Sequence, residues 1–377
     1  MFFTLFISYA AILVLSVNGQ VFPAVLSQIN ATSFEQGILL SFLFIMFPFT
    51  SAAIGLLTDR VGKRFVLAGG ALLLGIPFLI SAFVGSFWVR TFAVILFGIG
   101  MGTVEGQTSA LLSDSFPGKE RSVMNISQTF FSIGAAGGPF LIVVLYRLFP
   151  SMDLFAIFLT AGLLGIFLSV GFLFLKTERA MAPSAVNINL HDLLSDRNWK
   201  LLAAGLFAYV ASEMGTVSWL AKYGTNFLGL SVKTGPVCIA LFWTGLGISR
   251  FAVGSGFNRF KSRHILLFSF SLTLMFQLLA FSTLKLWVVF PSILFMGIGM
   301  GPVWPTIVSV AGARYSGSNG FAVGALIAMG GLAVSAVQPL IGFLAKQEVL
   351  GLRYALLSLS LLTVYNIIRF GFAKNWD

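Results

Sequence analysis

The chain has 377 residues, of which 58% are hydrophobic and only 9% are charged, and its mean hydropathy is +0.96. A soluble domain carries about 25% charged residues, so this composition excludes a soluble enzyme, a secreted disulfide scaffold and a disordered chain, and it indicates a polytopic membrane protein. The net charge of +11 is typical of basic residues retained in cytoplasmic loops, and we expect no nucleic-acid binding.

Long, mostly uncharged stretches divide the chain into twelve predicted membrane-spanning helices. The first six are expected within residues 1–34, 36–58, 65–89, 91–112, 122–146 and 154–175. The last six are expected within residues 201–221, 234–249, 265–284, 286–311, 319–345 and 354–368. We therefore predict an all-α membrane protein of two six-helix bundles, residues 1–176 and 200–377, joined by a polar cytoplasmic linker over residues 177–199.

Lysine and arginine set the expected orientation. If the loops after every second helix and the C-terminus face the cytoplasm, most of the 23 basic residues lie on that side. Both termini are then expected in the cytosol, and we expect a multi-pass protein of a bacterial inner membrane.

The chain carries no motif typical of an enzyme or a metal site. Two histidines and one cysteine, Cys238, give no metal-ligand spacing. The loops contain no phosphate-binding loop, nucleophile arrangement or pair of carboxylates. We therefore expect no enzymatic activity, no cofactor and no metal, and we expect a monomer whose partners are the lipid bilayer, protons and a small-molecule substrate.

Two segments of the first half recur in the second half. GLLTDRVGKR (55–64) aligns with GSGFNRFKSR (254–263), and FGIGMG (97–102) aligns with FMGIGMG (295–301). Both pairs are offset by 199 residues. Two independent motifs with one offset indicate a duplication, and an even number of helices in each half gives the two halves the same topology. Such parallel repeats are typical of one large class of transporters.

The segment GLLTDRVGKR resembles the loop motif between helices 2 and 3 of the major facilitator superfamily, Gly-x-x-x-Asp-Arg-x-Gly-Arg/Lys-Arg/Lys. The resemblance implies a charged cytoplasmic gate that forms in one state and breaks in the other. In the second copy Asn258 replaces the acid and Lys261 replaces the glycine, so we expect a weaker gate there. The expected gate residues are Gly55, Asp59, Arg60, Gly62, Arg64, Arg250, Asn258 and Arg259.

Four further patches resemble the fucose–proton symporter branch of that superfamily. They lie within residues 98–139, 209–223, 241–250 and 301–306. The first patch combines a glycine run and Glu105 with the helix-5 pattern Asn125-x-x-Gln128-x-Phe130. The branch also carries a proton-binding aspartate on helix 1, but the run from Ser16 to Gln20 contains no acid.

Only two acids fall deep inside the predicted spans, Glu105 and Glu213. A charge at the bilayer centre costs at least about 2.5–3.5 kcal/mol, and burial disfavours the charged form of a carboxyl group. Such a group suits a proton carrier, so both glutamates are candidates for binding a coupled proton. The alternative is a protonated glutamate in a structural hydrogen bond between helices.

Amide and aromatic side chains of the central helices are candidates for binding a polar solute. Trp219 and Tyr223 share a helix face because they are four residues apart, and Trp304 is the repeat equivalent of Glu105. Sugar sites combine amides with aromatic faces, although any one aromatic residue has core packing as its alternative. The candidates are Asn18, Gln20, Gln107, Asn125, Gln128, Trp219, Tyr223, Trp304 and Gln338.

These observations predict a secondary active transporter that takes up a sugar-like solute with a proton by alternating access. One alternative is a multidrug or metabolite–proton antiporter, since the segment from Gly134 to Pro139 is half of a glycine–proline motif typical of antiporters. The other alternative is a receptor on a transporter fold that carries no flux.

Overall fold

The computed structural model describes residues 2–116, 120–149, 151, 153–175, 193, 195–256, 260–315, 319–373 and 376, and every regular element in them is helical. The first half comprises α1 (Phe2–Gly19), α2 (Val21–Val25), the 3₁₀ helix η1 (Leu26–Gln28), α3 (Ser33–Ile45), α4 (Phe47–Val61), α5 (Lys63–Phe83), α6 (Phe87–Ser115), α7 (Glu120–Leu148) and α8 (Asp153–Leu173). The second half comprises α10 (Arg197–Val217), α11 (Leu220–Phe227), α12 (Val237–Gly256), α13 (Ser262–Ser282), α14 (Leu286–Met300), α15 (Val303–Arg314), α16 (Asn319–Leu344), α17 (Leu352–Ser358) and α18 (Ser360–Phe372).

The chain is a multi-pass membrane protein. Among the described residues, 10 helical stretches are long and apolar enough to cross a bilayer, and α10 with α11, bent by 43°, forms an eleventh candidate. A shorter apolar stretch, Val237–Ala252, lies in α12. The helices follow the predicted order, whereas the count of twelve spans and the division into two six-helix bundles stay predictions.

Several of the apolar helical stretches are broken within their length, which a count of apolar residues does not reveal. The break between α1 and α2 falls at Gln20, three residues before Pro23, and the break between α14 and α15 falls at Gly301 and Pro302. Proline has no backbone N–H to donate to the carbonyl four residues earlier, so it favours a break or a kink. These breaks bring irregular backbone close to the cavity described below.

One boundary differs from the prediction for a local reason. The seventh span was expected from residue 201, but α10 begins at Arg197 because Asp196 caps it. The Asp196 carboxylate accepts hydrogen bonds from the backbone N–H of Asn198 (2.6 Å) and of Trp199 (3.3 Å). A side-chain oxygen at this position satisfies donors that the first helical turn leaves unpaired. The rest of the predicted linker, apart from residues 193 and 195–199, lies outside the described residues.

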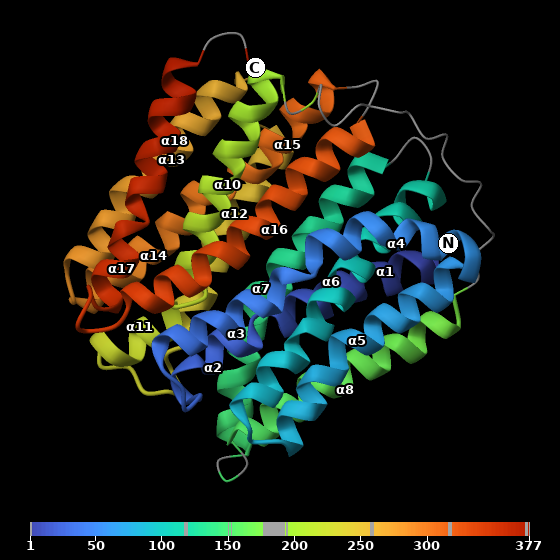
Figure 1. Cartoon of the computed structure of the whole chain (residues 1–377), viewed down its shortest axis with the longest axis horizontal. Helices are drawn as coiled ribbons and strands as arrows, with labels where there is room; N and C mark the ends of the chain where they lie inside the picture. Colours follow the sequence, from blue (N-terminus) through green and yellow to red (C-terminus); the bar gives the residue numbers. More distant parts are fainter. Residues whose placement is uncertain are drawn as a thin grey trace.

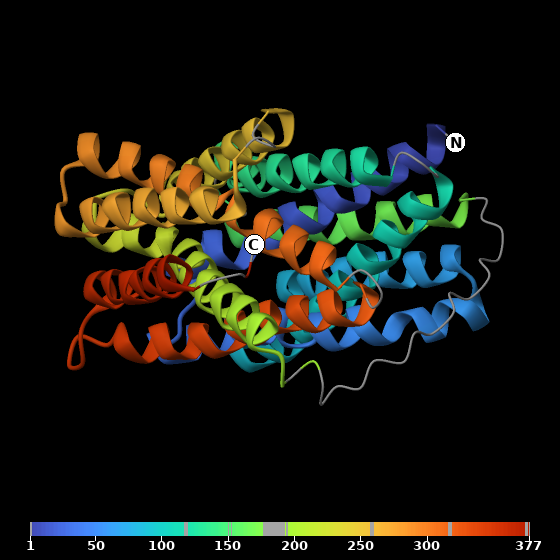
Figure 2. The ribbon, with the colours of Figure 1, turned by 90° about the horizontal axis from the view of Figure 1, so that it is seen from above.

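The two halves lie side by side (Figures 1 and 2), with the blue-to-green helices α1–α8 on one side and the yellow-to-red helices α10–α18 on the other. Within the first half, α5 packs against α6 and α8, and α1 packs against α7. Within the second half, α14 packs against α12 and α13, and α10 packs against α16 and α18. Between the halves, α3 and α4 pack against α16, α7 packs against α12, and α11 packs against α2 and η1.

Glycine permits the closest of these approaches. A Cβ atom added at Gly37 of α3 would lie 2.4 Å from the carbonyl oxygen of Gln338 in α16, and one at Gly342 of α16 would lie 2.4 Å from the carbonyl oxygen of Ser33. Small residues let helix backbones approach in this way inside membranes. The α3–α16 contact therefore joins the two halves at backbone distance.

The contacts of the glycine motif repeat with the same offset as its sequence. A Cβ at Gly100 would lie 2.7 Å from the Gly70 oxygen and 2.8 Å from the Leu74 nitrogen. A Cβ at Gly299 would lie 3.0 Å from the Ser269 oxygen and 2.8 Å from the Thr273 nitrogen. Ser269 and Thr273 follow Gly70 and Leu74 by 199 residues, as Gly299 follows Gly100. A duplicated helix packing accounts for this agreement.

Candidate functional site

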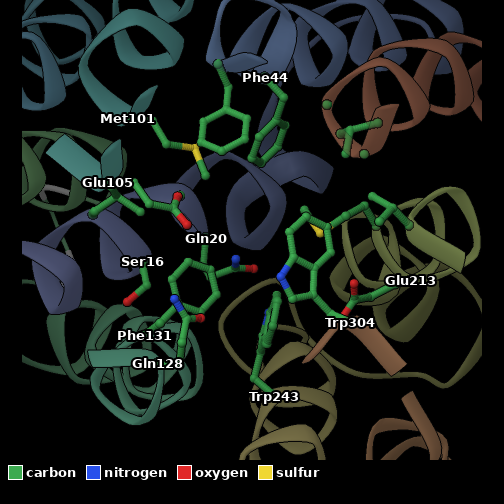
Figure 3. Close-up of a pocket in the computed structure, with 18 of the residues that line it drawn as sticks. Ser16, Gln20, Phe44, Met101, Glu105, Gln128, Phe131, Glu213, Trp243 and Trp304 are labelled. Atoms are coloured by element: carbon green, nitrogen blue, oxygen red, sulfur yellow. The ribbon is translucent and has the colours of Figure 1, made fainter. Parts of the chain in front are cut away.

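A cavity lies between the two halves (Figure 3). It has a volume of about 850 Å³, including the part open to solvent. Helices α1, α3, α4, α6 and α7 supply one wall, and α10, α12, α15 and α16 supply the other. The lining residues are Leu15, Ser16, Gly19, Gln20, Phe44, Phe47, Met101, Glu105, Gln128, Phe131, Val210, Glu213, Met214, Trp243, Arg250, Trp304, Gly330, Gly331 and Val334.

Five of the residues predicted to bind the solute or the proton line this cavity: Gln20, Glu105, Gln128, Glu213 and Trp304. Glu105 of α6 and Glu213 of α10 enter from opposite sides, with Gln20 and the Trp304 ring between them (Figure 3). Gln20 reaches the cavity from the break between α1 and α2. The cavity thus collects both of the acids and two of the amides that the sequence singled out.

Arg250 of α12 supplies the cation among the described residues that line the cavity. Its guanidinium attracts the carboxyl groups of both Glu105 and Glu213. Its Nε donates to the carbonyl oxygen of Gly301 at 3.4 Å, and its charge acts on the Tyr209 hydroxyl. Sequence analysis assigned Arg250 to the cytoplasmic gate, whereas the structure places it in the cavity wall.

Three buried polar atoms of the cavity lining have no hydrogen-bond partner: Gln20 Oε1, Glu213 Oε1 and Trp243 Nε1. An unpaired buried polar group costs about 1–3 kcal/mol, so native structures rarely leave one without a purpose. Two acceptors and one donor of the residues that form the cavity wall are thus without a partner in the structure.

Aromatic rings make up much of the rest of the wall. Phe131 of α7 and Trp243 of α12 meet edge to face across the boundary between the halves, with ring centroids 5.7 Å apart. The Trp304 ring packs so closely on α16 that a Cβ at Gly330 would lie 3.1 Å from it. Sequence analysis did not select Trp243 or Phe131. The signal was present for Trp243, because it precedes Arg250 by seven residues and so shares a helix face with it.

Three predicted binding residues of the second half, Trp219, Tyr223 and Gln338, bond within that half and do not line the cavity. Trp219 Nε1 donates to Gln338 Oε1 at 2.8 Å. Gln338 Nε2 donates to the Met214 carbonyl and to Ser218 Oγ, both at 2.9 Å. The Tyr223 hydroxyl donates to the Ala280 carbonyl at 3.1 Å. These contacts brace the bend between α10 and α11.

Two predicted binding residues of the first half, Asn18 and Gln107, also lie away from the cavity lining. Asn18 Nδ2 donates to the carbonyls of Leu74 (3.2 Å) and Ala161 (3.0 Å), which joins α1 to α5 and α8. Gln107 is buried but does not line the cavity. The side chain of Asn125 lies outside the described part of the structure.

The predicted gate loop is described in part. Gly62 ends α4 with φ of 95°, a conformation that favours glycine. Lys63 forms an ion pair with Asp114 of α6, a partner that sequence analysis did not identify. The Arg64 guanidinium lies over the Phe65 ring, 4.4 Å from its centroid.

Other predicted gate residues carry fewer contacts. Arg60 is exposed in the last turn of α4, and Gly55 lies within that helix. The side chain of Asp59 and the residues Asn258 and Arg259 lie outside the described part of the structure.

The fold defines a helical multi-pass membrane protein with a central cavity, and comparison with known proteins gives its family. Residues 1–338 match the Major Facilitator Superfamily, and the chain belongs to this family.

The fold is similar to the crystal structure of a bacterial homolog of the human lysosomal transporter Spinster in an inward-facing and occupied conformation. The TM-score is 0.80 at 14% identity, covering 97% of this chain and 95% of that one. It is also similar to the transporter FucP in the outward conformation, with a TM-score of 0.67 at 16% identity, covering 98% and 99%. The E. coli fucose:proton symporter FucP aligns likewise, with a TM-score of 0.66 at 16% identity, covering 98% of each chain.

A curated relative matches part of the chain. A gentisate transporter of Corynebacterium glutamicum is 29% identical over 153 residues, which are 40% of this chain and 33% of that protein. The match therefore spans about a third of the length of this relative.

Proposed function

We propose that this protein is a proton-coupled secondary transporter that takes up a small polar solute by alternating access. In this proposal residues 1–176 and 200–377 form two six-helix bundles that rock about the central cavity, and residues 177–199 link them in the cytoplasm. The observation that carries the proposal is the pair of acids from opposite halves, Glu105 and Glu213, which attract one arginine inside the cavity.

Contacts between the halves support a state closed at one end. Lys222 Nζ of α11 donates to Ser33 Oγ (3.0 Å) and Gln36 Oε1 (2.5 Å) of α3, and Ser41 Oγ donates to the Ser335 carbonyl of α16 at 2.7 Å. These contacts lie toward the end that holds α2 and α11, away from the marked chain termini (Figure 1). If both termini face the cytosol of a bacterial inner membrane, the cavity is closed to the outside in this state.

Proton coupling would follow from the chemistry of the cavity. An acid inside a membrane-spanning segment is a candidate proton carrier, and Glu105, Glu213 and Arg250 all line this cavity. The surroundings of these acids change when the halves move, so the state of the transporter and the protonation of the acids become linked.

The likeness to FucP favours a sugar as solute, and the gentisate transporter favours an aromatic acid. Counterflow of labelled fucose and gentisate in proteoliposomes that contain the purified protein separates these two solutes. For the solute that exchanges, a proton gradient should drive accumulation, and this accumulation should fall in Glu105→Gln and in Glu213→Gln while exchange persists.

Accumulation that is unchanged in both variants would contradict proton coupling through these acids. Release of protons from the vesicles on solute addition would instead support an antiporter, and the absence of flux for every solute would support a receptor.

A further inference from the structure

We propose that the solute is an organic monocarboxylate with a flat apolar body. Its carboxylate binds Arg250, and an oxygen at the other end of the molecule accepts a hydrogen bond from Trp243 Nε1. This inference rests on the proposed function in one respect, which is that the solute binds in the cavity. It narrows the solute from small polar molecules in general to anions.

The first argument is the state of Arg250. The side chains of Arg250, Glu105 and Glu213 are all described, and Arg250 forms no ion pair within 4.0 Å with either glutamate. Its guanidinium carries five N–H donors in a planar fork. A long hydrogen bond from Nε to the Gly301 carbonyl occupies one donor of this fork. A planar carboxylate matches the free donors with two parallel bonds, which a sugar hydroxyl cannot form.

The second argument is an unpaired donor on the same helix. Trp243 is 2% exposed, lines the cavity, and has no acceptor for its indole N–H. It precedes Arg250 by two helical turns, about 10 Å along α12, so both side chains face the same space. Two donors at the ends of this face suit a molecule with an acceptor at each end, not one with many hydroxyl donors.

The space between these donors is apolar. Phe131 packs edge to face on Trp243, and Phe44, Phe47 and Trp304 complete the wall around it. The acceptors Gln20 Oε1 and Glu213 Oε1 remain for one or two hydroxyl groups on the ring of the solute. A hydroxylated aromatic acid satisfies the cation, the orphaned donor and these acceptors together.

The charges of the cavity link such an anion to protons. The titratable groups that face Arg250 are Glu105 from α6 and both Glu213 and Tyr209 from α10. On α7, the cavity residues Gln128 and Phe131 are uncharged. When a carboxylate occupies Arg250, the two glutamates lose the attraction that favours their ionised form. Anion binding therefore promotes proton binding, and by reciprocity a bound proton promotes anion binding.

Matched pairs of probes test the proposal on the purified full-length protein. Binding of benzoate and benzamide, and of 4-hydroxybenzoate and 4-hydroxybenzamide, is measured by calorimetry and by tryptophan fluorescence. Each acid should bind about tenfold to a hundredfold more tightly than its amide, because a charged hydrogen-bonded pair replaces a neutral one. Equal affinities, or no binding of either acid, would overturn the proposal.

Variants show which residues cause the preference for each acid over its amide. Arg250→Gln should abolish the preference for the acid, and Arg250→Lys should retain part of it, since lysine keeps the charge but not the fork. Arg369→Gln, an exposed arginine of α18, is the matched control and should keep the full preference. A preference that survives in folded Arg250→Gln protein would overturn the proposal.

If both arginine variants fail to fold, a third variant, Trp243→Phe, tests the proposed site. Trp243→Phe keeps the ring and loses the N–H, so it should weaken 4-hydroxybenzoate binding several-fold more than benzoate binding. An equal effect on both acids would remove Trp243 from the site.

The outcomes separate this inference from the proposed function. Acids that bind without flux would leave the anion site standing and contradict transport. Proton-driven flux of fucose, with no binding of the acids, would leave transport standing and overturn the anion site.

Discussion

Glu105 of α6 and Arg250 of α12 attract each other across the boundary between the two halves without forming an ion pair within 4.0 Å. Glu213 attracts the same guanidinium from within Arg250's own half. A relative movement of the halves changes the separation of Glu105 and Arg250, whereas Glu213 and Arg250 move together. The two glutamates are therefore not equivalent, although both line the same cavity.

We expect this difference to appear in transport by the glutamate variants. Glu105→Gln should abolish proton-driven accumulation, because the carboxyl whose surroundings change with the conformational state is lost. Glu213→Gln should reduce accumulation less and weaken solute binding more. Both are measured in proteoliposomes as the ratio of driven uptake to exchange, with Glu35→Gln at an exposed helix start as control. Equal losses in the two variants would contradict the distinction.

Binding of a carboxylate should take up protons. The ionised forms of Glu105 and Glu213 compete with the solute for Arg250, so the affinity for benzoate should fall as pH rises. The measurement is proton uptake from weakly buffered solution on addition of benzoate, with the neutral benzamide as control. Benzoate binding without proton uptake would show that the anion and the protons are independent.

Lys222 should stabilise closure at the end that holds α2 and α11. Its ammonium bridges to Ser33 and Gln36 of the other half, and hydrogen bonds to charged groups contribute about 1.5–3 kcal/mol. The measurement uses protein that carries Ser335→Cys as the reporter and Cys238→Ala to remove the native thiol. In this protein Lys222→Met should increase the rate at which the introduced cysteine reacts with a water-soluble thiol reagent. Lys233→Met changes an exposed lysine instead and should leave this rate unchanged.

Alanine at the two equivalent glycines should destabilise the protein to a similar extent. A Cβ at Gly100 or Gly299 would lie within 3.0 Å of the facing backbone, so Gly100→Ala and Gly299→Ala should each lower the melting temperature by several degrees in detergent. Gly69→Ala is the control, since nothing lies within 4 Å of a Cβ at that position. A loss at one glycine alone would show that the duplicated packing is no longer equivalent.

The Asp196 cap of α10 should make a pH-dependent contribution to the stability of the fold. Burial raises the pKa of Asp196, but hydrogen bonds from Asn198, Trp199 and Tyr315 outweigh it and hold the pKa below its ordinary value. The lowered pKa means that the capping carboxylate stabilises the fold above about pH 4, the ordinary value for aspartate. This contribution is lost as pH falls through the lower, folded-state pKa.

Asp196→Ala should therefore cost about 1 kcal/mol at neutral pH. Thermal unfolding at about pH 7 and about pH 3 should show the difference from the native protein shrinking in acid. Asp196→Asn keeps a capping oxygen and should retain most of the stability at both pH values. A cost of Asp196→Ala that is the same in acid would contradict a role for the charged carboxylate.

The sequence by itself determined the family, the order of the helices and the repeat. Sparse charges separate the spans, because ionised groups are costly in lipid. The FGIGMG repeat predicts equivalent packing, and Gly100 and Gly299 do contact equivalent backbone atoms. The rarity of buried acids also sufficed to select Glu105 and Glu213, both of which line the cavity.

Tertiary structure alone decided which polar residues face that cavity. In helices that are apolar all round, no polar stripe distinguishes the faces toward lipid, a neighbouring helix or a cavity. Trp219 and Gln338 looked like binding residues, but they bond to each other, whereas Arg250 looked like a gate residue and lines the cavity. The face that each side chain occupies depends on which helices pack against its own, and those partners come from distant parts of the chain.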